Sequence, residues 1–119
     1  MAITLAYLCS STSWGGLEMN QLKNAGWMMA RGHSVFILCK KDSPIEKAAS
    51  DAHIPTLIIG KHKKYYDFSA GKKLAKQIDD NNITHVIVRD TRDMSVAVIA
   101  KRKSIKKMHL SYFMELKLG

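Results

Sequence analysis

The sequence of 119 residues is poor in cysteine and has no long hydrophobic run. Its two cysteines, Cys9 and Cys39, have no CxxC spacing, so they indicate neither a disulfide framework nor a metal site. No apolar run approaches the roughly 18 residues that a membrane-spanning helix needs. The apolar residues 1–10 lack a basic leader and a small-residue cleavage site, which predicts a first strand and a cytoplasmic location.

Acidic residues are also scarce, with 10 Asp and Glu against 19 Lys and Arg, which gives a net charge of +9. The basic residues gather at 61–64, 72–76 and 101–107. This excess favours anionic partners such as nucleotide diphosphates, acidic lipid surfaces or nucleic acid, although a solvated surface is the better explanation of any one cluster. Nucleic acid is disfavoured, because aromatic residues interleave with basic ones in a single stretch, 61–66.

What the sequence does contain is an alternation of strand and helix signals. Short apolar runs predict strands over 3–9, 35–39, 56–59, 84–88 and 108–113. Helices are predicted between them: 16–31, one ending near Ala52, one capped by Ser69, and one capped by Asp90 or Thr91. Gly32 suits a left-handed helix end, and Ser43, Pro44 and Glu46 form a capping box.

This alternation predicts an α/β fold: a doubly wound, mostly parallel, five-stranded Rossmann-like sheet with helices on both faces. With the common strand order 3-2-1-4-5, ligands bind beyond the carboxyl ends of the first and fourth strands, where the order reverses. The chain stops soon after the fifth strand, at Gly119, so we expect residues 1–119 to be a truncated piece of a larger protein.

Two segments are predicted to meet at this reversal. In residues 10–16, Gly15 and Gly16 permit a tight turn and let backbone N–H groups approach a phosphate at the start of the next helix. A purely structural turn fits the local pattern equally well. The segment has no GxGxxG fingerprint and no P-loop lysine, which argues against a dinucleotide site and an ATPase.

The second segment, residues 89–93, has an unusual concentration of charge. Arg89 and Arg92 can make bidentate contacts with phosphate or sugar oxygens, and Asp90 can accept from a hydroxyl. Asp90 can equally be a helix cap, and Asp93 can complement the helix dipole. Glu115 either faces the same rim or is simply solvated. The sequence leaves the catalytic residues unknown, because no catalytic constellation is complete. It predicts no metal site, because none of the five histidines has metal-ligand spacing.

The pattern resembles the N-terminal, acceptor-side domain of glycosyltransferase family 4, whose members have the two-domain GT-B fold. The matching stretches cover nearly the whole chain: Gly15-Gly16-Leu17-Glu18, residues 31–35, residues 39–44 and residues 84–93. The resemblance implies retaining transfer of a sugar from a nucleotide-sugar co-substrate, without another cofactor, to a saccharide or lipid-linked envelope acceptor. The donor would bind mainly to a second domain that this chain lacks, so the chain alone would be inactive.

The resemblance also implies roles for individual residues. Gly15 and Gly16 would lie near the donor phosphates, and the acceptor pocket would be lined by Trp14, Glu18, Arg89, Asp90, Arg92 and Glu115. Where many members carry a histidine after the fifth strand, this chain has Glu115. The basic surface suggests contact with the anionic inner face of a membrane. The alternative is a stand-alone basic Rossmann-like module that binds a nucleotide or nucleic acid without catalysis.

Overall fold

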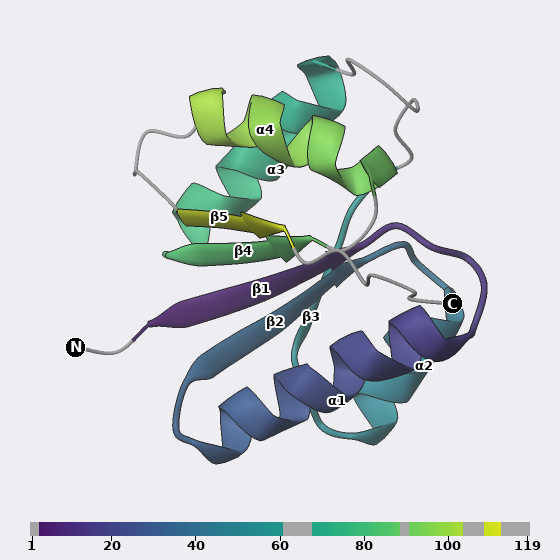
Figure 1. The fold of residues 1–119 in the computed structure, drawn as a ribbon. Coiled ribbons are helices and arrows are strands. Elements are labelled where there is room, and N and C mark those ends of the chain that lie inside the picture. The colour runs from purple at the N-terminus through teal and green to yellow at the C-terminus, as the bar shows by residue number, and fades with distance from the viewer. Residues whose placement is uncertain (1–2, 61–67, 89–90, 104–108, 113–119) are drawn as a thin grey trace, which may run out of the picture.

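The computed structural model describes residues 3–60, 68–88, 91–103 and 109–112 (Figure 1). Strands and helices alternate throughout, as predicted: β1 (Thr4–Cys9), α1 (Gly16–Ala30), β2 (Ser34–Cys39), α2 (Pro44–Asp51), β3 (Thr56–Ile58), α3 (Phe68–Asp80), β4 (His85–Val88), α4 (Thr91–Lys103) and β5 (His109–Tyr112). Two predicted helix caps are wrong. Helix α3 already begins at Phe68, so Ser69 lies inside its first turn and cannot be its N-cap. Helix α4 begins at Thr91, so Thr91 cannot be its N-cap either, and Asp90, the other candidate, lies outside the described residues.

The strands form one parallel sheet in the order β3-β2-β1-β4-β5. In Figure 1, α1 and α2 cover one face of this sheet and α3 and α4 cover the other. The predicted α/β, Rossmann-like architecture is therefore confirmed. Side chains are described for the four strands β3-β2-β1-β4, whereas β5 is described through its backbone pairing with β4.

Alternation of side chains along the strands produces two separate cores. In β1, Ala6 and Leu8 face the core under α3 and α4, whereas Tyr7 and Cys9 face the core under α1 and α2. Because successive residues of a strand point to opposite faces, a strand buried on both sides must be apolar at every position. This explains why the strands appear in the sequence as continuous apolar runs.

Two local signals read from the sequence are confirmed. Gly32 has φ 92°, and the N–H groups of Gly32 and His33 donate to the carbonyls of Met29 and Met28, which is a Schellman ending for α1. At α2, Ser43 is the N-cap as predicted, because its hydroxyl accepts from the N–H of Glu46 at 3.3 Å. The reciprocal bond of a capping box is absent from this described turn: the Glu46 carboxylate accepts from the N–H of Asp42 at 2.8 Å, and the Ser43 N–H donates to the Lys40 carbonyl. The first signal fixes the loop that leads into β2, and the second fixes the loop that follows β2.

The two helices on the second face pack closely at Gly71 of α3. A Cβ built on this glycine would lie 2.3 Å from Cγ2 and 2.7 Å from Cβ of Ile99 in α4. Such distances are far inside van der Waals contact, so the glycine is what lets α3 and α4 approach one another. None of the described helices is long and apolar enough to cross a membrane.

Candidate functional site

The site is defined by the reversal of strand order between β1 and β4. The two strands pair in parallel, from Leu5 opposite His85 to Leu8 opposite Val88, so their carboxyl ends lie at the same edge of the sheet. From that edge β1 leads to α1 on one face, and β4 leads to α4 on the other (Figure 1). Diverging connections of this kind leave a crevice in which doubly wound proteins bind ligands.

Ser10 and Asp93 connect the two sides of this edge. The Ser10 N–H donates to Asp93 Oδ2 at 3.0 Å, and the Ser10 hydroxyl donates to Asp93 Oδ1. Both residues are buried, with 3% and 1% of their surface exposed. The sequence assigned Asp93 to the dipole of its own helix, but its carboxylate also holds the residue that follows β1. We refer to this pair as the Ser10–Asp93 clasp.

Glu18 occupies the start of α1. Its Oε1 accepts from the hydroxyls of Ser11 at 2.7 Å and Ser13 at 3.1 Å, and the backbone N–H groups of Gly15 and Glu18 also bond to its carboxylate. Burial alone would raise the pKa of Glu18, but these hydrogen bonds outweigh it, and the pKa is lowered. The ionised carboxylate therefore acts as the helix cap and offsets the positive end of α1.

Gly15 and Gly16 do not need to be glycine for conformational reasons. Gly15 has φ −153°, an extended backbone that any residue adopts, and Gly16 is already helical. This corrects the expectation that the glycines serve a tight turn. A Cβ on Gly16 would meet nothing within 4 Å, so the lack of side chains leaves open space above the first turn of α1.

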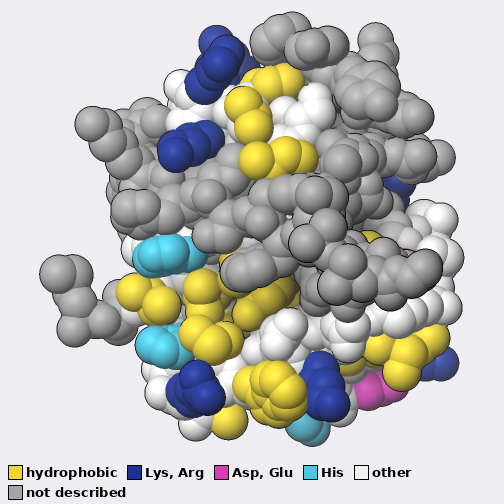
Figure 2. All heavy atoms as spheres, in the orientation of Figure 1, with side chains coloured by type: hydrophobic (Ala, Val, Ile, Leu, Met, Phe, Trp, Pro, Cys, Tyr) yellow, Lys and Arg dark blue, Asp and Glu magenta, His cyan; other side chains and the backbone are white. Residues whose placement is uncertain are grey.

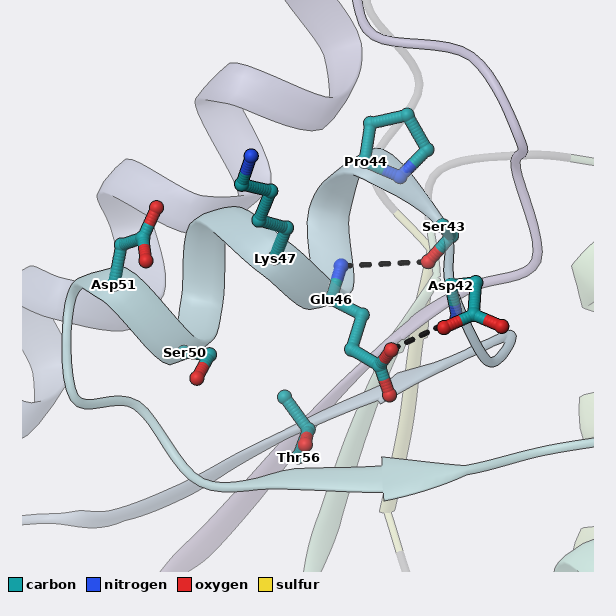
Figure 3. A pocket seen from close by; sticks show the side chains of 8 residues that line it. All are labelled: Asp42, Ser43, Pro44, Glu46, Lys47, Ser50, Asp51 and Thr56. Atoms are coloured by element: carbon teal, nitrogen blue, oxygen red, sulfur yellow. Dashed lines mark hydrogen bonds between the residues drawn. The ribbon is translucent and has the colours of Figure 1, made fainter.

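Trp14, α1 and the connection between α2 and β3, which contributes Ala52 and Ile54, line a groove. Trp14 is 44% exposed and lines a hollow of about 590 Å³ together with Met19, Lys23 and Trp27 of α1. A second hollow, of about 690 Å³, is lined by α2, by the residues just before it and by Thr56 of β3, and most of these residues are polar (Figure 3). Glu46, Ser50 and Thr56 are among the residues that line it, and Glu46 Oε1 accepts from the Asp42 N–H at 2.8 Å.

The remaining predicted site residues can be placed only in part. Arg89, Asp90 and Glu115 lie outside the described residues. Arg92 is the second residue of α4, one position before Asp93, and its side chain is not described. The grouping of Arg89, Asp90, Arg92 and Glu115 into one pocket therefore stays a prediction, as do the pocket roles of Trp14 and Glu18 and the phosphate role of Gly15 and Gly16.

The sequence reading missed one further buried polar residue near this edge. Gln21 is 2% exposed, and its Nε2 donates to the Leu8 carbonyl at 3.1 Å. In the sequence, the one indication of its burial is that Gln21 shares a helix face with Glu18 and Ala25. Within the described part of the chain, no group of three His, Cys, Asp or Glu side chains could hold a metal ion.

Comparison with known proteins gives agreement in fold. No protein-family model and no curated protein sequence matches the chain. Among solved structures, a glycosyltransferase from Rickettsia africae ESF-5 superimposes with a TM-score of 0.77 over 93% of this chain at 17% identity. MurG from Acinetobacter baumannii gives a TM-score of 0.73 over 94% of the chain at 13% identity. Anabaena Alr3699/HepE in complex with UDP-glucose gives 0.71 over 92% at 15% identity.

In each case the chain spans about a third or less of the other protein: 29%, 35% and 28% of these three chains respectively. Sequence identity this low establishes the fold and no more. Residues 1–119 therefore have the fold of one Rossmann-like domain of the GT-B glycosyltransferases.

Proposed function

We propose that this chain is the acceptor-side domain of a retaining, family 4 glycosyltransferase that transfers a hexose from a nucleotide sugar to a saccharide or lipid-linked envelope acceptor. The observation that carries the proposal is the Ser10–Asp93 clasp. It joins the residue after β1 to the first turn of α4 at the strand-order reversal, where a ligand would bind. Two flanking loops held together in this way can present their side chains to one substrate.

The proposed roles follow from charge. Glu18 already offsets the positive end of α1, so the backbone at Gly15 and Gly16 cannot hold a diphosphate by the helix dipole alone. The guanidinium groups of Arg89 and Arg92 would supply the missing positive charge, since arginine binds phosphate oxygens in a bidentate manner. Trp14, Asp90 and Glu115 would complete the acceptor pocket beside Glu18.

The nucleotide part of the donor would be held mainly by a second domain. The similar glycosyltransferases are about three times as long as this chain, which leaves room for such a domain. Among them, HepE is described in complex with UDP-glucose, and a uridine diphosphate sugar is therefore the first donor to test.

The experiment compares residues 1–119 alone with the protein made from its complete reading frame. We expect transfer from a nucleotide sugar by the complete protein and none by the 119 residues. In the complete protein, Arg92→Ala should lower kcat/KM by roughly a hundredfold, the usual loss when one charge-stabilising contact is removed. Arg102→Ala is the matched control, because Arg102 is exposed in the last turn of the same helix. Turnover by the 119 residues, or equal effects of the two variants, would overturn the proposal.

A further inference from the structure

Helix α1 contains a glycine that its own packing does not explain. Gly26 lies in the interior of the helix, where glycine is less favourable than alanine because it loses more backbone freedom on folding. A Cβ built on Gly26 would meet nothing within 4 Å, whereas a Cβ on Gly71 of α3 would collide with Ile99. Gly26 therefore keeps open a space that no described residue fills.

This open space belongs to the groove between α1 and the connection from α2 to β3. Gly26 lines the groove, whose volume of about 590 Å³ is typical of small-ligand sites. Trp27, Met19 and Trp14 line it too, and they are 57%, 52% and 44% exposed. They are three of the four large hydrophobic side chains exposed in the described part of the chain. Exposed apolar surface gathered around one hollow marks a binding site.

Polar groups lie beside the two indole rings. The Lys23 ammonium is 5.3 Å from the centre of the Trp27 ring, a cation–π contact that favours one orientation of the ring. Asn20 lines the groove three residues before Lys23, on the same side of α1, and the described lining includes no carboxylate. Figure 2 shows hydrophobic side chains lying between Lys and Arg side chains in the region of α1. Flat apolar faces therefore alternate with ammonium, amide and indole N–H groups, which are all hydrogen-bond donors.

From this lining we infer that the groove binds a saccharide chain. A pyranose ring has a face of C–H bonds, which packs on an indole ring, and a rim of hydroxyls, which accept from ammonium and amide groups. Residues from both ends of α1 line the groove, from Trp14 just before the helix to Met29 near its end. A helix of 15 residues is about 22 Å long, which suits several linked sugars better than a single one.

The groove begins at the candidate site. Trp14 lies in the connection from β1 to α1, shortly after Ser10, whose bonds to Asp93 mark the strand-order reversal. A saccharide held in the crevice would continue from there into the groove. That this saccharide is the acceptor rests on the proposed function, whereas binding of a saccharide chain by the groove does not.

Two other occupants fit the groove less well. A two-fold dimer brings the same patch of both subunits together, so Lys23 would face Lys23 between two chains that each carry a net charge of +9. A flat lipid surface would make no use of the hollow at Gly26. Both alternatives are outcomes of the test below.

The experiment uses the protein's own fluorescence, because the chain has two tryptophans and both line the groove. Maltohexaose, mannohexaose and chitohexaose are titrated separately, and glucose, mannose and N-acetylglucosamine serve as the single-sugar comparison. We expect at least one hexasaccharide to change the emission in a saturable manner. It should bind roughly tenfold more tightly than its own monosaccharide, because only the longer ligand reaches both indole rings.

Gly26→Ala is the sharpest variant, because its effects on stability and on binding should have opposite signs. Alanine is the better helix former, so the melting temperature should rise by roughly 2–4 °C. The added methyl group enters the groove, so the affinity for the hexasaccharide, measured by titration calorimetry, should fall at least roughly fivefold. The rise in melting temperature also shows that weaker binding does not come from unfolding.

Trp27→Ala should weaken hexasaccharide binding roughly tenfold, because it removes one stacking face. Its matched control is Ile58→Ala, which truncates the fourth exposed hydrophobic side chain, on the edge strand β3. We expect this control to leave the affinity within twofold of the unchanged protein.

The inference is overturned if none of the three hexasaccharides changes the emission, or if Gly26→Ala leaves their affinity unchanged. Dimers abolished by Trp27→Ala, or binding to anionic vesicles without any binding of saccharide, would overturn it in favour of a second copy or a membrane. Failure of the proposed function looks different. Hexasaccharide binding by the groove, with no sugar transfer by the complete protein, would refute the transferase and leave the groove as a saccharide site.

Discussion

Replacing Asp93 with alanine tests whether the Ser10–Asp93 clasp contributes to the fold of the candidate site. The substitution removes the acceptor of both the N–H and the hydroxyl of Ser10, and Ser10 is only 3% exposed. A buried polar group that loses its partner costs about 1–3 kcal/mol. We therefore expect Asp93→Ala to reduce the free energy of unfolding by about 3 kcal/mol, and Ser10→Ala by about 1.5 kcal/mol because the backbone N–H bond remains.

These costs can be measured by urea unfolding followed by circular dichroism, and by thermal unfolding. For a chain of this size, 1 kcal/mol shifts the melting temperature by roughly 3–5 °C, so Asp93→Ala should melt roughly 10 °C lower. The control is Asp80→Ala, which removes an exposed carboxylate from the last turn of α3 and should change stability by less than about 0.5 kcal/mol.

The Ser10→Ala, Asp93→Ala double variant isolates the contact, because a double-mutant cycle removes whatever each side chain does elsewhere. We expect a coupling energy of about 1–2 kcal/mol, in the range seen for residues that share a hydrogen-bond network. If the stability losses of the two single variants add up to that of the double variant within about 0.3 kcal/mol, the Ser10–Asp93 contact contributes no interaction energy. The proposed function would then lose its main structural support.

Three further predictions concern packing, pH and thiol chemistry. Gly71→Ala should lower the free energy of unfolding, measured in urea, by about 1–3 kcal/mol, although alanine has the better helix propensity. The loss should be smaller in an Ile99→Ala background, where the side chain that the new methyl group meets has been shortened. An unchanged urea midpoint would show that α3 and α4 can separate freely. Glu18→Gln should lower stability by about 1 kcal/mol at neutral pH. Because the folded pKa of Glu18 is lowered, this difference should be present above the ordinary value of 4.5 and disappear as the pH falls through the folded pKa; a difference that persists in acid contradicts the cap. Cys9 and Cys39 should resist labelling by a disulfide reagent until the protein unfolds, since both are buried and burial raises their pKa to about 12 and about 11; rapid labelling of the native protein would contradict this.

The sequence predicts the architecture well because its signals are local. Apolar strands, the Gly32 helix end and the Ser43 cap depend on nearby residues, and the strand order is a common one for doubly wound sheets. The candidate site is less predictable because its contacts join residues far apart in the chain. Ser10 and Asp93 are 83 positions apart, and nothing in either neighbourhood indicates the other. Gly15 and Gly16 illustrate a second limit, because composition cannot distinguish a glycine needed for conformation from one needed for access.

The buried bond from Gln21 to the Leu8 carbonyl has a mechanical consequence. It fastens the second turn of α1 to the last part of β1, two residues before Ser10. A load that pulled the helix along its axis would have to break this bond inside a dry interior, where no water can replace it. Force applied to α1 would therefore be transmitted directly to the carboxyl end of β1, so that the helix and the crevice would move together.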